Sequence, residues 1–151
     1  MSIWFRSFTL DELNQQSRGC MVELLDIRFT EIGPDYIRAT MPVDARTWQP
    51  FGLLHGGASV TLAETLGSVA ANCCVDANRF FCVGQEINAN HLRAVRSGRV
   101  TGTARPIHVG NRSHVWEIRV EDEKQRLICI SRLTMSVVEG ATPPIVGGAP
   151  S

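Results

Sequence analysis

A single carboxylate in a long uncharged stretch is the residue best placed to do chemistry. Between residues 47 and 75, Glu64 is the one charged side chain. This stretch predicts a helix that is apolar on all sides and therefore buried, so the carboxylate needs a partner or a use. We predict that Glu64 is catalytic. Two other interpretations stay open: an ion pair with an arginine on a strand, and a helix face that is exposed.

Ser68 follows Glu64 by one turn of the predicted helix and lies on the same face. From there its hydroxyl could hold a water molecule or orient the carboxylate. The alternative is a helix serine with no role in chemistry.

A loop containing two glycines leads into the same helix. The chain reads Gln-Pro-Phe-Gly-Leu-Leu-His-Gly-Gly from Gln49 to Gly57. The glycines let a ligand approach the first free N–H groups of the helix, where the positive end of the helix dipole stabilises a developing oxyanion. Gln49 could add a side-chain donor, and His55 could bind a ligand or only cap the helix. The competing interpretation is that Gly56 serves tight packing at a helix start.

Distance separates the glycines from the carboxylate. Gly57 and Glu64 are seven residues apart, which is about 10 Å along a helix. One acyl carbon cannot touch both groups. If a glycine N–H polarises a carbonyl that Glu64 attacks or hydrates, the two groups come from different chains related by a two-fold axis. We therefore predict at least a dimer with shared active sites.

The charge of the chain is balanced in total but not along its length. Its 15 Lys and Arg against 15 Asp and Glu give a formal net charge of zero, which argues against a general nucleic-acid binder. Residues 87–116 nevertheless hold five arginines, three histidines and no acidic side chain. Arginine suits bidentate phosphate contact, so the loops at 89–94 and 108–113 are predicted to bind a polyanion. Solvated strand faces also collect arginine, which is the alternative. The five arginines are Arg93, Arg96, Arg99, Arg105 and Arg112.

Several other classes of chemistry find no support in the sequence. No His or Cys pair has the spacing of a metal site, and there is no nucleophile elbow, P-loop or dinucleotide fingerprint. The five scattered cysteines favour reduced, buried thiols. No apolar run is long enough to span a membrane and no signal peptide is recognisable. We therefore expect a cytoplasmic protein.

Periodicity and punctuation place these residues in a two-layer α+β domain. A capping box at Thr9 and Glu12 predicts a short helix over 10–18, and the apolar stretch predicts a long helix over 55–75. Period-two runs predict a hairpin before the long helix and four strands after it, with short connections that favour antiparallel neighbours. The predicted strands cover 25–32, 36–43, 80–90, 100–107, 114–121 and 127–138.

This order, β-β-α-β-β-β-β, predicts a sheet of about six strands that wraps the long helix. The domain is expected to cover residues 1–139. Residues 140–151 are rich in Pro and Gly, and we expect this tail to be disordered.

Two runs carry a resemblance to a known family. From Gln49 to Ser68 the chain reads Gln-Pro-Phe-Gly-Leu-Leu-His-Gly-Gly-Ala-Ser-Val-Thr-Leu-Ala-Glu-Thr-Leu-Gly-Ser, and from Val83 to His91 it reads Val-Gly-Gln-Glu-Ile-Asn-Ala-Asn-His. They resemble the hotdog-fold acyl-CoA thioesterases. The similarity is to the bacterial branch with 1,4-dihydroxy-2-naphthoyl-CoA hydrolase of menaquinone synthesis, the enterobactin-pathway proofreading thioesterase and the Arthrobacter-type 4-hydroxybenzoyl-CoA thioesterase.

The resemblance implies a hotdog homotetramer, a dimer of dimers, that hydrolyses an acyl-CoA thioester without a metal or redox cofactor. By motif, Glu64 would be the nucleophile or general base, and the Gly56 N–H with Gln49 would polarise the thioester carbonyl. His55 matches a histidine beside that carbonyl, and Ser68 a serine near the attacking water. The segments that match the acyl and CoA groove are Gly84, His91, Leu92, Arg93, Ala94, His108, Val109, Gly110, Asn111, Arg112 and Ser113.

Two departures from the family pattern concern the substrate. Val69 stands where some relatives carry methionine, and the tail extends past the usual end. An aromatic hydroxylated acyl group is the first choice by resemblance and a short or medium fatty acyl group the second, with acyl-carrier-protein thioesters as further candidate substrates. The competing functions are a hotdog hydratase or dehydratase and a non-catalytic acyl-CoA-binding module.

Overall fold

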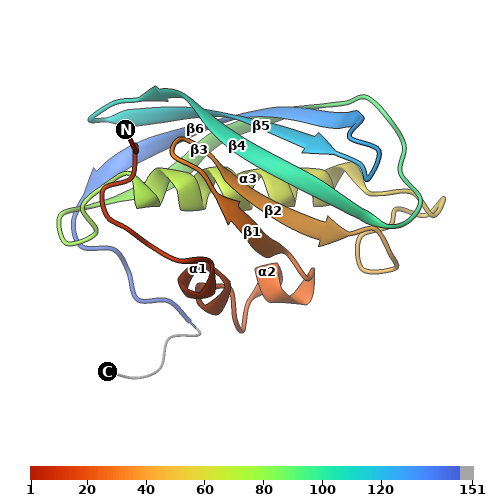
Figure 1. Cartoon of the computed structure of the whole chain (residues 1–151), viewed down its shortest axis with the longest axis horizontal. Coiled ribbons are helices and arrows are strands. Elements are labelled where there is room, and N and C mark those ends of the chain that lie inside the picture. Colours follow the sequence, from red (N-terminus) through yellow and green to blue (C-terminus); the bar gives the residue numbers. More distant parts are fainter. Residues whose placement is uncertain (147–151) are drawn as a thin grey trace.

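One long helix, α3 (Gly56–Cys73), packs against one face of a six-stranded antiparallel sheet (Figure 1). The computed structural model describes residues 1–146. Two short helices, α1 (Leu10–Gln16) and α2 (Met21–Leu24), precede the sheet. The predicted α+β architecture and the order of the long helix and the strands are confirmed. The strands are β1 (Arg28–Ile32), β2 (Ile37–Pro42), β3 (Phe80–His91), β4 (Arg99–Val109), β5 (Ser113–Glu121) and β6 (Leu127–Glu139).

The pairing of the strands differs from the prediction at β3. The order in the sheet is β1-β2-β4-β5-β6-β3, so β3 pairs with β6, from Phe80↔Glu139 to His91↔Cys129. The prediction that β3 pairs with the next strand in sequence is wrong. The physical reason is the path of α3, which contacts every strand from β2 to β6 and so carries the chain beneath the sheet to its opposite edge.

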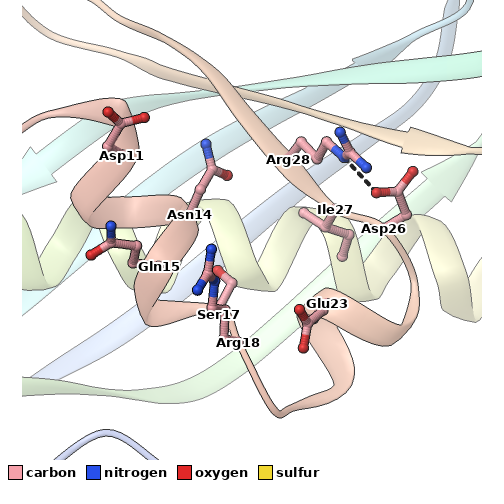
Figure 2. A pocket seen from close by; sticks show the side chains of 9 residues that line it. All are labelled: Asp11, Asn14, Gln15, Ser17, Arg18, Glu23, Asp26, Ile27 and Arg28. Carbon is pink, nitrogen blue, oxygen red and sulfur yellow. Dashed lines mark hydrogen bonds and ion pairs between the residues drawn. The ribbon is translucent and has the colours of Figure 1, made fainter. Parts of the chain in front are cut away.

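Helix α1 begins where the sequence predicted, but strand β1 starts three residues later than predicted. The capping box is present, with the Thr9 hydroxyl accepting from the Glu12 N–H at 3.2 Å and the Thr9 N–H donating to Glu12 Oε2 at 2.7 Å. Residues 25–27, predicted as strand, instead complete a turn after α2 in which Asp26 has φ of 52°. The Asp26 carboxylate is held there by the Arg28 guanidinium (Figure 2).

Helix α3 buries one face rather than its whole circumference. The prediction of burial on all sides is therefore wrong for a single chain, because the sheet covers only one side of the helix. Glu64 and Ser68 lie on the partly buried side. The fully buried residues of α3 are Ser59, Leu62, Ala63, Leu66, Gly67, Ala70 and Ala71.

Two asparagines attach helices to the two edge strands of the sheet. Asn14 of α1 bonds both backbone groups of Phe29 in β1: its Nδ2 donates to the carbonyl at 3.1 Å and its Oδ1 accepts from the N–H at 2.9 Å. Asn72 of α3 does the same to Cys82 in β3, at 3.1 and 2.8 Å. Each amide satisfies an edge that would otherwise expose unpaired backbone groups.

Both ends of the chain return to the C-terminal end of α3. The Phe5 N–H donates to the Cys73 carbonyl at 2.9 Å, and the Thr142 N–H donates to the Ala77 carbonyl at 2.9 Å. These bonds attach the N-terminal segment and the start of the predicted tail. Residues 147–151 lie outside the described residues, so disorder of the tail stays a prediction for them. None of the helices within residues 1–146 is long and apolar enough to cross a bilayer.

Candidate active site

The Glu64 carboxylate lies directly over a glycine of the edge strand β3. A Cβ built on Gly84 would stand 2.6 Å from Glu64 Oε1 and 3.9 Å from Met135 Sδ. Any larger residue at position 84 would therefore displace the carboxylate. The sequence resemblance had placed Gly84 in the substrate groove, and the structure gives a local reason for glycine there.

No cation neutralises Glu64 within one chain. Over residues 1–146 the ion pairs and side-chain hydrogen bonds do not include its carboxylate. The interpretation of Glu64 as half of an intrachain ion pair with a strand arginine is therefore wrong. A partly buried carboxylate without a partner is a candidate for chemistry.

Ser68 lies one turn from Glu64, as predicted, but does not bond to it. Its hydroxyl donates to Met135 Sδ at 3.8 Å, a weak contact that leaves its lone pairs free to accept from a ligand or water. Asn72, one further turn along, fixes β3 through Cys82. Glu64, Ser68 and Asn72 thus form a polar stripe with a spacing of four residues. The sequence prediction missed Asn72, although this spacing in an otherwise apolar helix was a usable signal.

A separate group of predicted residues meets at the N-terminus of α3. Gln49, Gly56 and the segment 91–94 line one cavity of about 390 Å³. His91 lies against the helix start, since a Cβ on Gly56 would stand 2.9 Å from His91 Nε2. The structure therefore joins these predicted residues in one place.

The first turn of α3 leaves one N–H free. His55 is the N-cap; its Nδ1 accepts from the Gly57 N–H at 2.8 Å, and its carbonyl accepts from the N–H groups of Ala58 and Ser59. For the Gly56 N–H, the described part of the chain provides no acceptor. Because Nδ1 is an acceptor, the proton of a neutral His55 ring is assigned to Nε2. Of the two glycines, Gly56 is thus the one able to donate to a ligand.

The Gln49 side chain is oriented by its own loop. Its Oε1 accepts from the Phe51 N–H, which leaves the Nε2 amide group as the free end. This group and the Gly56 N–H both border the 390 Å³ cavity. Two hydrogen-bond donors without a carboxylate are what a polarised carbonyl oxygen requires.

The carboxylate group and the donor group lie far apart in one chain. Glu64 is at the level of Gly84, and the donors are at the level of His91. Gly56 and Glu64 are eight residues apart in α3, which is about 12 Å at roughly 1.5 Å per residue. The chain therefore positions both groups of predicted catalytic residues but does not bring them together.

The basic segment is also divided. Arg99 pairs with Asp26 at 3.0 Å and Arg105 with Asp35 at 2.9 Å, so two of the five arginines hold the first hairpin in place. Within residues 1–146, no such pair forms at Arg93, Arg96 or Arg112.

The two predicted phosphate-binding loops lie at opposite ends of the sheet. The strand register aligns Val109, His114, Met135 and Gly84, which places the turn 108–113 at the level of Glu64. The segment 91–94 lies with the donor group. Each predicted catalytic group thus has one basic loop at its own end of the sheet.

The cysteines do not form a disulfide or part of a metal-binding cluster within the described residues. All five are free thiols. Burial raises the pKa of Cys73 to about 12 and that of Cys74 to about 12. At neutral pH both are uncharged thiols, which are poor nucleophiles.

Comparison with known proteins identifies a family. The sequence profile of the Thioesterase superfamily matches residues 51–129. The chain is 57% identical over 136 residues to 1,4-dihydroxy-2-naphthoyl-CoA hydrolase of Escherichia coli, covering 90% of this chain and 99% of the relative. It is 52% identical over 136 residues to the proofreading thioesterase EntH of Cronobacter turicensis, covering 90% of this chain and 98% of the relative.

A solved structure of a relative has the same fold. A crystal structure of a mutant of thioesterase PA1618 from Pseudomonas aeruginosa superposes with a TM-score of 0.90 at 52% identity. The superposition covers 91% of this chain and 99% of that one.

Proposed function

The chain belongs to the thioesterase superfamily and has its hotdog fold, and from this premise we propose that it hydrolyses an aromatic or medium-chain acyl-CoA, with Glu64 as the catalytic carboxylate. The products are the free acid and the CoA thiol. The observation that carries the assignment is the Glu64 carboxylate itself, partly buried, without a cation among residues 1–146, and fitted over Gly84.

Glu64 has two chemically balanced routes to the products. As a general base it takes a proton from water while the water oxygen adds to the thioester carbon, and collapse of the oxyanion expels the CoA thiolate, which takes up the proton. As a nucleophile it adds directly to the thioester carbon and the C–S bond breaks, so the CoA thiolate leaves and an anhydride forms. Water then hydrolyses the anhydride to the free acid and the Glu64 carboxylate, and the proton released protonates the thiolate. Both routes pass through an oxyanion that needs preset donors.

The donors in this proposal are the Gly56 N–H and the Gln49 amide. Both are left free by their surroundings: the first because His55 satisfies the neighbouring N–H groups, the second because Phe51 occupies the amide oxygen. His91 stands against Gly56, where it narrows the approach to the carbonyl site.

The active site in this proposal is shared between two chains. Within one chain the carboxylate group and the donor group are separated by more than one substrate carbonyl can span. A two-fold axis that sets two α3 helices antiparallel would place the donors of one chain beside the Glu64 of the other. It would also bring the segment 91–94 of one chain to the turn 108–113 of the other, giving one continuous basic groove for the phosphates of CoA. We propose a dimer on this basis, and the dimer of dimers is proposed from the resemblance to the family alone.

The acyl group is proposed to be aromatic first and medium-chain second. The name of one close relative, 1,4-dihydroxy-2-naphthoyl-CoA hydrolase, supports the aromatic group as the first choice. A panel of aromatic and fatty acyl-CoA substrates, compared by kcat/KM, tests it.

The test of the catalytic assignment is substitution of Glu64. Glu64→Gln and Glu64→Ala are expected to reduce kcat by at least about 1,000-fold and to leave the affinity for an unhydrolysable substrate analogue within about threefold, because the carboxylate acts mainly in the transition state. The release of CoA thiol measures turnover, and calorimetry measures binding. Near-normal turnover of Glu64→Gln would refute the assignment. A matched control is Glu86→Gln on exposed β3, which should retain normal turnover.

A further inference from the structure

A large cavity begins one helical turn from Glu64, at Ser68. Its volume is about 670 Å³, within the range of about 300–1,000 Å³ typical of ligand pockets. Ser68 and Val69 of α3 and Val83 of β3 form its inner end. Val83 precedes Gly84, over which the carboxylate lies, so the cavity adjoins the reacting group on the side away from the helix N-terminus.

The far walls of this cavity come from both ends of the chain. The N-terminal segment contributes Phe5 and Phe8, and the start of the tail contributes Thr142, Pro143 and Ile145. The tail is held in this position by two bonds from Thr142, whose N–H donates to the Ala77 carbonyl at 2.9 Å and whose hydroxyl donates to the Phe80 carbonyl at 3.4 Å. A segment expected from its composition to be unpacked therefore closes a cavity beside Glu64.

Several polar groups in these walls already have partners. The Asn72 amide is used by the Ser68 carbonyl and by Cys82, and the Cys73 thiol is uncharged because burial raises its pKa to about 12. At the rim Arg6 and Glu12 face each other at 3.5 Å and offset each other's charge. Most of the other side chains that line the cavity are apolar, and the one further charge, Asp76, lies just past the C-terminal end of α3, where it accepts from the Asn78 N–H at 3.1 Å. The chemistry that fits the part of the cavity nearest Ser68 and Val83 is therefore an uncharged apolar group.

The length of the cavity sets the size of that group. Its wall follows α3 from Ser68 to Cys73, about 7.5 Å at roughly 1.5 Å per residue, and continues past the end of the helix to Val75. A single benzene ring would fill only part of it. A bicyclic aromatic ring or a medium chain reaches from the carboxylate toward the tail.

We propose that this cavity receives the acyl group of the substrate and that the tail residues 142–145 form a specificity-determining wall that favours large apolar acyl groups over small ones. The proposal rests on the function proposed above, because it takes Glu64 as the reacting carboxylate. It adds a role for a part of the chain that lies outside the matched family profile, which ends at residue 129.

The test compares the binding of two unhydrolysable analogues of an acyl-CoA. In both, a methylene separates the carbonyl from the CoA sulfur; one carries a phenyl ring and the other a 2-naphthyl ring. The wild-type chain is expected to bind the naphthyl analogue at least about tenfold more tightly, because extra apolar contact in a pocket is worth about 10- to 200-fold. Ile145→Asp is expected to weaken the naphthyl analogue about tenfold and the phenyl analogue less than about twofold.

Val146→Asp is the matched control. Val146 is the next residue, is 87% exposed and does not line the cavity, so the same change of charge there should leave the preference for naphthyl unchanged. Ile145→Ala, which adds no charge, should shift the preference in the same direction as Ile145→Asp by a few-fold. Equal effects of Ile145→Asp and Val146→Asp, or equal losses for the two analogues, would overturn the proposal.

Binding and turnover keep the two proposals distinct. The analogues cannot be hydrolysed, so their affinities report on the tail wall even if the chain hydrolyses no acyl-CoA in the panel. Absence of turnover with an intact naphthyl preference would refute the proposed function alone. Normal turnover with a preference unaffected by Ile145→Asp would refute the tail wall alone.

Discussion

The first turn of α3 and its middle differ in the polar groups that they leave without a hydrogen-bond partner. At the first turn, the Gly56 N–H and the Gln49 amide are donors without an acceptor in the described chain. In the middle, Glu64 is a carboxylate without a donor among residues 1–146. The first turn thus holds free donors and the middle holds a free acceptor. A separate cavity lies near each of the two places. These are the two complementary halves that the proposed shared site requires.

A third cavity shows that polar groups at a cavity of this molecule can also be fully paired. It has a volume of about 330 Å³ between α1, α2 and the start of β1, and it is lined by both acids and bases (Figure 2). Here Asp26 is paired with both Arg28 and Arg99. Although burial alone would raise its pKa, these guanidinium partners bring the pKa of Asp26 below its usual value. A satisfied charge of this kind stabilises the fold, and none of the predicted catalytic residues lies there.

Removing the Gly56 N–H is expected to have the largest effect after substitution of Glu64. Gly56→Pro deletes the donor at the first helical position, where proline is tolerated, and the preceding His55 already has the extended φ of −67° and ψ of 132° that proline requires. Loss of one oxyanion donor costs about 100- to 1,000-fold in kcat. Gly56→Ala is the control, because it adds the same Cβ against His91 but keeps the N–H. Steady-state kinetics of the pair measure the difference. If both variants lose the same activity, the N–H is not a donor to the substrate.

Gly84→Ala, which fills the space under the Glu64 carboxylate, is expected to reduce kcat less than Gly56→Pro does. In Gly84→Ala the new Cβ would lie 2.6 Å from Glu64 Oε1, so the flexible Glu64 side chain must move away. A misplacement of about 1 Å at a reacting group can cost about 100-fold, and we expect a loss of about 10- to 100-fold in kcat with little change in KM. Asn88→Ala, at an exposed position of the same strand, is the control. A Gly84→Ala variant as active as Asn88→Ala would separate Glu64 from the chemistry.

Substitution of the two edge asparagines is expected to have the smallest effect on kcat. Comparing the two variants distinguishes a loss of stability from a loss of strand positioning. Asn14→Leu and Asn72→Leu each leave one strand residue without its partner for N–H and C=O, and each is expected to cost about 1–3 kcal/mol in the free energy of unfolding. Only Asn72 holds the strand that carries Gly84. Asn72→Leu should therefore reduce kcat several-fold at a temperature at which both variants are folded, whereas Asn14→Leu should not. Denaturant unfolding and kinetics on the same samples provide the comparison, and equal kcat values for the two variants would show that Asn72 has no positioning role.

The sequence was sufficient for features that depend on local pattern. Glu64 stands out because its neighbours are uncharged, Gly56 because a loop with glycines meets a helix start, and the capping box at Thr9 because its spacing is fixed by the helix. The layer architecture followed from the order of the periodic segments. These are properties of stretches shorter than about 20 residues, for which the chain encodes its own structure.

What the sequence did not predict depends on contacts between distant segments. The pairing of β3 with β6 is decided by the path of α3 beneath the sheet, and the pairing of Arg99 with Asp26 by the packing of the first hairpin. Asn72 was overlooked because its use is set by Cys82 across the layer, and α2 because four residues give too short a period to detect. The position of Ile145 in the lining of the 670 Å³ cavity was hidden by a composition typical of loops.

The sharing of the site between chains is tested most directly by mixing two inactive variants. Glu64→Ala lacks the carboxylate half and Gly56→Pro lacks the donor half. In a two-fold dimer that contains one chain of each, one site carries both defects and the other carries none. Random pairing in co-expressed protein makes about half of the dimers mixed, so the sample should recover about a quarter of the wild-type kcat per chain.

The control for this measurement mixes two variants of the same half. Glu64→Ala with Gly84→Ala leaves every site with a damaged carboxylate half, so activity should stay at the average of the two variants measured alone. If the site is shared, the mixture of Glu64→Ala with Gly56→Pro recovers to about a quarter of wild-type activity, and the control pair shows no recovery. Activity of the first mixture no higher than that of its separate variants, in samples shown to contain mixed dimers, would contradict a site shared between chains.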